Sequence, residues 1–415
     1  MVSRQAAGLA ARTPAIATAH FRAEAAPYHP VRCPDGYVNL GTAENRLVWD
    51  LLAPRLAARR SPAAADTRYA PLYGTPALRE VLADLLSAQC RTAVSAEELV
   101  VVSGATAALD VLATALCDPD ELIVVPAPYY GAFDLDMCGR SRARLVPVPM
   151  PDGDGFRLAA GPIDRVLGLA RRHGRPARVL ALTSPSNPVG HVHSAATLRE
   201  IADVAACHDV AVIADEIYAG SVFGQDTSFV SLLDPSVNRG HRHRSHLVWG
   251  FAKDFGLPGL KVGVAYSPDP AVREAVRALA YFAPTSTDTQ ALLTALLADP
   301  DWVDCFRAES RRRLGASYAR CTRLLDELDI PYAPASAGFS IWTDLRRWLT
   351  APTFDAERAL WKHIFDGARV NILPGEMFGC PQPGWFRICH TTEPHLVSAG
   401  IARLGRVLGP PAPKD

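Results

Sequence analysis

The sequence predicts an α/β fold in which a mostly parallel sheet lies between layers of helices, joined to a smaller α+β domain. Two observations indicate this. Short runs rich in Val, Ile and Leu, each followed by Gly, Pro, Ser or Asp, are typical of strands buried on both faces of a parallel sheet. Helix-like stretches lie between these runs, and such alternation is typical of layered α/β domains. The predicted strands lie in residues 98–104, 121–128, 178–185, 209–216 and 246–253.

Helices are predicted between these strands, and the pattern changes after about residue 270. Helical runs then dominate, with two later strand candidates and a final helix. We therefore expect a large domain over residues 61–285 and a small C-terminal domain over 286–415, with residues 1–60 forming an N-terminal arm and part of the small domain. The clearest helices lie in 77–88, 105–116, 196–207 and 397–408, and the late strands in 338–345 and 385–392.

Composition excludes several classes of protein. The 415 residues include 43 Lys and Arg and 43 Asp and Glu, with 49% hydrophobic residues, which excludes a largely disordered chain and argues against nucleic acid as a partner. The nine cysteines are scattered without a CxxC pair, so neither a disulfide framework nor a zinc ribbon is expected. No apolar run reaches the roughly 20 residues of a membrane span, and the start lacks a signal-peptide core. We expect a cytoplasmic enzyme with poorly ordered termini and no membrane partner. The His-rich stretches 191–193 and 240–246 are interpreted as exposed loops, so no metal site is expected.

Ligands in open α/β sheets bind beyond the C-terminal ends of the strands, so the residues that follow each strand are candidates for the site. Residues 103–106 are small and open a helix, which suits an anion but also an ordinary tight turn. Tyr130 follows the second strand, where its ring could stack on a ligand or pack in an interface. Asn187 follows the third strand, where turn chemistry alone accounts for an amide.

The last two strands are followed by ionisable residues. Asp215 ends the fourth strand and Tyr218 lies three residues later; together they could hold a pyridinium nitrogen and a ring oxygen, although an Asp here can also cap a helix. Lys253 follows the fifth strand among apolar residues and glycines. Burial lowers the pKa of a lysine and makes it a Schiff-base nucleophile, whereas a lysine that extends to the surface is the alternative.

Taken together, the order and positions of these residues resemble the fold type I pyridoxal-phosphate (PLP) enzymes of the class I/II aminotransferase superfamily. The resemblance extends from about Tyr37 to Arg387. It implies an aspartate aminotransferase-like fold and pyridoxal 5'-phosphate as the cofactor.

The resemblance also implies a role for each matching residue. Lys253 corresponds to the lysine that binds the cofactor and later moves the α-proton of the substrate. Asp215 corresponds to the partner of the pyridine nitrogen, which keeps the ring protonated as an electron sink. Asn187 and Tyr218 correspond to the pair that bonds the ring hydroxyl, and Tyr130 to the stacked aromatic residue.

Four further residues match the family pattern. The backbone of Ala105 and Thr106 corresponds to the phosphate cradle. Arg387 corresponds to the arginine that holds the substrate α-carboxylate with a bidentate fork. Tyr69 corresponds to the tyrosine that reaches the active site of the neighbouring subunit, which implies a homodimer with shared sites.

Two positions depart from the pattern. Gly250 stands where relatives usually have a Ser that binds phosphate, and Lys261 stands where they usually have an Arg. A lysine offers a point charge instead of a planar fork. We therefore expect a less tightly specified phosphate site, with weaker cofactor affinity or another group filling the space.

Several segments resemble 1-aminocyclopropane-1-carboxylate (ACC) synthases more closely than ordinary aminotransferases, including residues 41–47, 128–136, 215–223 and 253–260. In that branch Glu44 corresponds to a glutamate near the substrate that favours S-adenosylmethionine; a solvated acid near a helix start is the alternative. The resemblance implies that S-adenosylmethionine loses its α-proton and then releases methylthioadenosine by γ-elimination or γ-substitution. The product then forms by cyclisation, or by carbon–carbon bond formation with a second substrate. A class I/II aminotransferase is the second hypothesis, and a non-catalytic sensor is a third that the retained Lys253, Asp215 and Arg387 disfavour.

Overall fold

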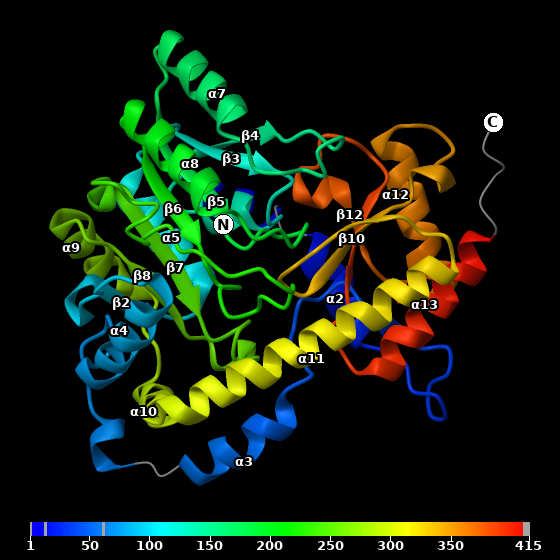
Figure 1. Ribbon diagram of the computed structural model, residues 1–415, viewed down its shortest axis with the longest axis horizontal. Helices are drawn as coiled ribbons and strands as arrows, with labels where there is room; N and C mark the ends of the chain where they lie inside the picture. The colour runs from blue at the N-terminus through cyan, green and yellow to red at the C-terminus, as the bar shows by residue number, and fades with distance from the viewer. Residues whose placement is uncertain (1, 12–14, 60–62, 410–415) are drawn as a thin grey trace.

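A seven-stranded sheet forms the larger part of the molecule (Figure 1). The computed structural model describes residues 2–11, 15–59 and 63–409. The strand order is β2-β8-β7-β6-β5-β3-β4, and β8 alone in this sheet runs antiparallel to its neighbours. The carboxyl ends of the parallel strands therefore meet at one edge. The strands are β2 Leu99–Val102, β3 Leu122–Ala127, β4 Arg144–Pro149, β5 Ala177–Thr183, β6 Ala211–Asp215, β7 Ser245–Gly250 and β8 Gly263–Tyr266.

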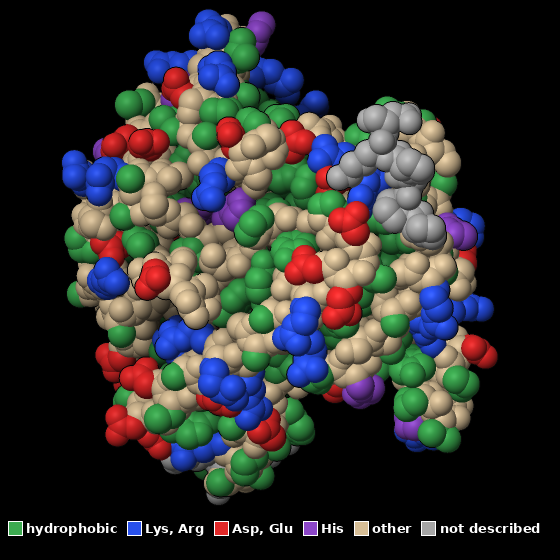
Figure 2. Space-filling view, turned by 45° about the vertical axis from the view of Figure 1, so that its right-hand side comes forward, with side chains coloured by type: hydrophobic (Ala, Val, Ile, Leu, Met, Phe, Trp, Pro, Cys, Tyr) green, Lys and Arg blue, Asp and Glu red, His purple; other side chains and the backbone are tan. Residues whose placement is uncertain are grey.

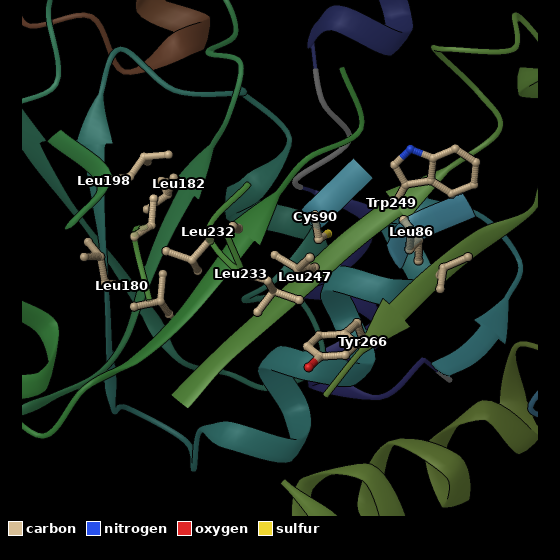
Figure 3. Close-up of a cluster of buried hydrophobic side chains, with 14 of the residues drawn as sticks. Leu86, Cys90, Leu180, Leu182, Leu198, Leu232, Leu233, Leu247, Trp249 and Tyr266 are labelled. Atoms are coloured by element: carbon tan, nitrogen blue, oxygen red, sulfur yellow. The ribbon is translucent and has the colours of Figure 1, made fainter. Parts of the chain in front are cut away.

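Alternate residues of these strands pack on helices at opposite faces, because successive side chains of a strand point to opposite sides. On one face, Leu180, Leu182 and Leu247 pack with Leu86 and Leu198 of the covering helices (Figure 3). On the other face a separate apolar cluster contains residues of two further long helices. The first face carries α4 Pro76–Cys90, α7 Ala160–Arg172, α8 Ala195–Cys207 and α10 Thr287–Leu297, and the second carries α5 Ala105–Leu116 and α9 Pro270–Leu279.

The layered α/β prediction is confirmed, and the five predicted strands correspond to β2, β3, β5, β6 and β7. Strands β4 and β8 are not among the predicted strands. Strand β4 is a partly exposed edge strand with two prolines, so it lacks the continuous buried run used as the signal. Strand β8 has four residues like β2, but it begins with Gly263, so its apolar run is shorter than that of β2.

The second body contains a four-stranded antiparallel sheet in the order β12-β13-β10-β9. Its strands β10 and β13 fall within the two late strand candidates. The N-terminal segment adds a short parallel pair, β1 with β11. The elements are β1 Val38–Asn39, β9 Tyr332–Ala333, β10 Ser340–Asp344, β11 Val370–Asn371, β12 Leu373–Pro374 and β13 Trp385–Cys389, with α2 Ala15–Glu24, α12 Phe354–His363 and α13 Pro394–Leu408 beside them.

One long helix, α11 Pro300–Glu327, extends from beside the large sheet to the second body (Figure 1). Near its start Phe306 stacks on Phe255 of the large core with ring centroids 5.4 Å apart. Near its end Leu325 is buried in the core of the small sheet. Helix α3 Trp49–Arg59 lies near its first turns and contacts α10, so this helix of the N-terminal segment accompanies the large sheet. The helix α11 therefore belongs to both hydrophobic cores.

Charged side chains of both signs are mixed over most of the face in Figure 2, with Lys and Arg gathered at the top of the view. Within residues 2–11, 15–59 and 63–409, no helix combines the length and apolarity needed to cross a bilayer. The same ranges contain no group of three His, Cys, Asp or Glu side chains arranged to hold a metal ion.

Candidate active site

A cavity of about 380 Å³ lies at the carboxyl ends of β5, β6 and β7, between the two sheets. The topology brings together segments that are more than 300 residues apart in the chain. Every predicted site residue except Tyr69 lines this cavity: Glu44, Ala105, Thr106, Tyr130, Asn187, Asp215, Tyr218, Lys253, Lys261 and Arg387.

Lys253 lies three residues after the end of β7, and its amine reaches the loop that follows β1. Its Nζ donates a hydrogen bond of 2.6 Å to the carbonyl oxygen of Ala43. Burial lowers the pKa of Lys253 to about 8, and the positive charge of Arg387 acts in the same direction. A substantial fraction of the amine is therefore neutral near pH 8, as covalent chemistry on a carbonyl requires.

Asp215 is the last residue of β6 and is 5% exposed. Its Oδ1 accepts a hydrogen bond of 3.2 Å from the backbone N–H of Ile217. Burial raises the pKa of Asp215 to about 7, which the positive charge of Lys253 partly opposes. A buried carboxylate is stabilised by a cationic hydrogen-bond donor, so this position fits the protonated nitrogen of a pyridine ring.

Two tyrosines line the cavity together with this carboxylate. The Tyr130 ring meets Phe133 edge-on at 5.5 Å between centroids, and Tyr218 meets Phe339 in the same way at 5.1 Å. Burial raises the pKa of both phenols, so they remain protonated hydrogen-bond donors at neutral pH. These contacts fix both rings in the wall of the cavity, where an aromatic surface suits a flat ligand.

The part of the cavity lined by Gly104, Ala105 and Lys261 is suited to an anion. Strand β2 ends next to Gly104, whose φ of 95° allows the turn into α5, and the 12-residue helix begins at Ala105. A Cβ at position 104 would lie 3.7 Å from the Nζ of Lys261. The N–H groups of a helix start and an ammonium group therefore converge here, which fits a phosphate.

The structure gives a physical reason for Gly250. A Cβ at this position would lie 2.8 Å from the carbonyl oxygen of Val262. Gly263, which pairs with Gly250, lies closer still to the turn, since its own Cβ would be 2.2 Å from the carbonyl carbon of Gly104. Backbone therefore occupies the space that a serine side chain would need. Glycine at 250 is a packing requirement of β7 and β8.

Arg387 enters the cavity from β13 in the small sheet and is 3% exposed. It donates hydrogen bonds of 3.1 Å to Oδ1 of Asn187 and 2.6 Å to the carbonyl oxygen of Gly41. Its guanidinium lies 4.7 Å from the centroid of the Phe378 ring. Within the part of the chain that the structure describes, its Nε has no hydrogen-bond partner. A buried guanidinium with an unused donor fits a carboxylate ligand.

Glu44 belongs to the loop that joins β1 to α3 and lines the same cavity. Its Oε2 accepts a hydrogen bond of 3.1 Å from Nε of Arg46. Its negative charge also raises the pKa of Lys253, which places the two charges within electrostatic reach. The cavity thus includes an acidic group in the same loop whose Ala43 carbonyl bonds to Lys253.

Some residues lie elsewhere or were not predicted. Tyr69 is fully exposed on this chain, away from the cavity. His390 is buried and packs against the rings of Phe223 and Tyr318.

Asp136 and helix α2 also line the cavity and were not predicted. Asp136 accepts a hydrogen bond of 3.1 Å from the Thr106 hydroxyl, and burial raises the pKa of Asp136 to about 6. Helix α2 contributes Ile16, Ala17, His20 and Phe21. No strand-end rule could have found them, because α2 is distant in sequence from every strand of the large sheet.

The fold and the sequence of this chain are similar to those of known proteins. The fold and the cavity define the chain as an enzyme with the aspartate aminotransferase-like architecture. The structure of aspartate aminotransferase from Thermus thermophilus with maleate aligns with a TM-score of 0.83 and 22% identity over 98% of this chain and 99% of that one. The family model for aminotransferase class I and II matches residues 36–404, and the chain belongs to that family.

Two curated relatives are closer in sequence than this solved structure. 1-Aminocyclopropane-1-carboxylate synthase 6 of Arabidopsis thaliana is 33% identical over 383 residues, covering 89% of this chain and 77% of the relative. 1-Aminocyclopropane-1-carboxylate synthase 2 of Oryza sativa subsp. japonica is 36% identical over 372 residues, covering 86% and 76%. Enzymes of this family use pyridoxal phosphate, and this protein is a PLP-dependent enzyme.

Proposed function

We propose that this enzyme acts on S-adenosylmethionine and releases methylthioadenosine, as a lyase or a γ-substituting enzyme. The single observation that carries the proposal is Glu44, a carboxylate that lines the cavity beside the loop bonded to Lys253. A carboxylate in a partly buried cavity favours a cationic group such as the sulfonium of this substrate. The similarity to ACC synthases over most of the chain supports the same assignment.

We assign the binding of the cofactor to residues whose chemistry fits each part of it. Asp215 would hold the ring nitrogen, Asn187 and Tyr218 the ring hydroxyl, and Tyr130 one face of the ring. At the phosphate end we assign the N–H groups of Ala105 and Thr106, with the ammonium of Lys261. When bound, pyridoxal phosphate supplies a protonated ring that stabilises negative charge at the α-carbon of an amino acid.

The remaining residues would act on the substrate. Arg387 would hold the α-carboxylate, which orients the α-hydrogen toward Lys253. Lys253 Nζ would take that proton, and the pKa of about 8 allows it to accept and return a proton near neutral pH. The bond from the γ-carbon to sulfur breaks with its electron pair on methylthioadenosine. The γ-carbon then bonds to the α-carbon. Alternatively, a second substrate bonds to the γ-carbon as the nucleophile, and the α-carbon regains its proton.

The proposal is tested by incubating the PLP-loaded enzyme with S-adenosylmethionine and measuring methylthioadenosine by chromatography. Amino acids with 2-oxoglutarate are offered in parallel, and the pyridoxamine form is followed by absorbance. Release of methylthioadenosine without amino-group exchange supports the proposal. Amino-group exchange without release contradicts it and identifies an aminotransferase.

Lys253→Ala is the matched control. It should lose turnover and the near-visible absorbance of the lysine-bound cofactor. Borohydride reduction followed by peptide mapping should place the label on Lys253 in the unaltered enzyme. A label on a different residue contradicts the assignment of Lys253.

We also propose a homodimer in which Tyr69 completes the active site of the partner subunit. The support is an exposed aromatic surface, because Tyr69, Tyr281 and Phe282 are all largely exposed. Tyr281 and Phe282 line a shallow depression with residues 70–73. Exposed aromatic side chains gathered in one place are typical of protein interfaces.

Mixing two inactive variants tests the shared site. Lys253→Ala and Tyr69→Ala homodimers should each have little activity. If each site combines Lys253 of one subunit with Tyr69 of the other, a mixed dimer contains one intact site and recovers part of the activity. A monomer by sedimentation, or no recovery in verified mixed dimers, contradicts the proposal.

A further inference from the structure

Helix α2 forms the outer wall of the active-site cavity. Ile16, Ala17, His20 and Phe21 all line the cavity, and their spacing places them on one face of the helix. Phe21 is 69% exposed although it borders the cavity, and its ring meets the His20 ring edge-on at 5.0 Å. An aromatic ring is therefore presented at the cavity mouth without a protein cover.

The opposite side of α2 is firmly packed. Ala19 and Ala23 are buried with Tyr37 and Phe365 in a small apolar cluster. Arg22 lies 4.8 Å from the centroid of the Phe365 ring and pairs with Asp366 at 2.8 Å. The helix is thus anchored to the second body, and the position of Phe21 follows from this packing.

His20 connects this wall to the loop at the centre of the site. Its Nδ1 lies 2.7 Å from the hydroxyl of Thr42 and 3.1 Å from Nδ2 of Asn39. Thr42 lies between Gly41, whose carbonyl bonds to Arg387, and Ala43, whose carbonyl bonds to Lys253. A group bound against α2 is therefore next to the positions where an amino acid would be held.

The outer wall differs in chemistry from the inner end. The inner end presents charged groups, including Arg387, Lys253, Asp215 and Lys261. The outer wall presents an aromatic ring, apolar side chains and an imidazole that can donate or accept a hydrogen bond. A flat nitrogen heterocycle bearing hydroxyl groups matches this combination.

We infer that His20 and Phe21 on α2 bind the adenosyl group of the substrate, with the base against Phe21 and a hydrogen bond to His20. The inference rests on the proposed use of S-adenosylmethionine and adds the residues that select this substrate over shorter amino acids. The α-carboxylate at Arg387 and the adenosyl group at α2 would then hold the two ends of one molecule.

The test measures ligand affinity by titrating the absorbance of the PLP-loaded enzyme with three ligands. These are S-adenosylmethionine, S-adenosylhomocysteine, which lacks the sulfonium charge, and L-methionine, which lacks the adenosyl group. Phe21→Ala should weaken both adenosyl ligands about tenfold and leave L-methionine unchanged. Phe21→Tyr should retain the affinity. Glu44→Gln should weaken S-adenosylmethionine much more than S-adenosylhomocysteine.

The control is Trp49→Ala, which removes an exposed aromatic side chain outside the cavity and should change none of the three affinities. If Phe21→Ala weakened the binding of all three ligands equally, α2 would only support the fold, and the inference would be overturned. Unchanged binding of all three ligands would overturn it as well. If the unaltered enzyme releases no methylthioadenosine, the proposed function fails and the inference with it. Release with unchanged adenosyl affinity in Phe21→Ala overturns the inference alone.

Discussion

At the scale of single residues, Gly250 makes a testable prediction about stability. Gly250→Ser should lower the free energy of unfolding by about 1–3 kcal/mol, because the new Cβ would lie 2.8 Å from the carbonyl oxygen of Val262. Gly153→Ser is the control, since a Cβ there has no other atom within 4 Å. Urea unfolding of both variants measures the effect. Equal stability of the two would contradict the packing explanation.

Lys261 yields a second prediction. Lys261→Arg should tighten the binding of pyridoxal phosphate, because a planar guanidinium can form two parallel bonds to one phosphate. Equilibrium dialysis or the absorbance of the bound cofactor measures the affinity. Lys362→Arg, an exchange in an exposed ion pair with Asp366, should leave it unchanged. An unaltered affinity in the first variant would indicate that Lys261 does not face the phosphate.

These residues also show what sequence reasoning can reach. The strand-end rule selected Asp215 and Lys253, and the structure brings both to one cavity because parallel strands end at one edge. The rule could not explain Gly250, because the reason is the close approach of the neighbouring strand β8, which the residues around position 250 do not reveal. It could not find Phe21, because that contact depends on how a distant helix packs.

At the scale of elements, the loops after β6 and β7 are joined by Asp254. Its carboxylate accepts hydrogen bonds of 2.7 Å from the N–H of Gly220 and from the hydroxyl of Ser221. The carboxylate is buried near Arg307 of α11, which lessens the rise in pKa that burial causes. The residue next to Lys253 therefore ties its loop to the loop that carries Tyr218.

Asp254→Ala should lower the free energy of unfolding by about 2–4 kcal/mol, because buried donors and the charge of Arg307 lose their partner. Asp254→Asn should cost less, since an amide oxygen still accepts a hydrogen bond. The exposed Asp154→Ala is the control. Denaturant unfolding measures all three. Identical losses for Ala and Asn would show that the hydrogen bonds contribute little.

The elements themselves were predictable to different degrees. Helix α5 has the bounds expected from the sequence, and α8 begins one residue earlier than expected. Helix α7 was missed, although Ile163 and Leu167 are buried at helical spacing, because its many arginines and glycines obscure the apolar positions. Element type was therefore clear where the apolar run was continuous and unclear where one helix face is strongly charged.

At the scale of the whole molecule, buried ionisable groups predict how stability depends on pH. Burial raises the pKa of Asp136 to about 6, of Asp215 and Glu357 to about 7, and of Glu216 to about 8. The folded state therefore holds these protons more tightly than the unfolded state, and their contribution to stability is lost as pH rises through the folded-state pKa. Buried histidines act oppositely, but only below their unfolded pKa of about 6.5.

The cofactor-free protein should therefore lose stability between pH 6.5 and pH 8, because several buried acids ionise in this interval, whereas Lys253, with a pKa of about 8, opposes the loss only near its upper end. Glu216→Gln should remove up to about 2 kcal/mol of this loss, because the amide does not ionise. Denaturant unfolding at the two pH values measures the difference. Constant or rising stability in the unaltered protein over this interval contradicts the prediction.

Helix α11 has a mechanical consequence. With 28 residues at about 1.5 Å each, it is a rod of roughly 42 Å whose two halves are embedded in different cores. A sliding motion of the large sheet against the second body is therefore restricted by α11. A relative rotation of the two would require this helix to bend or tilt. A ligand bound by residues of both parts would add a second connection between them and would restrict their relative rotation.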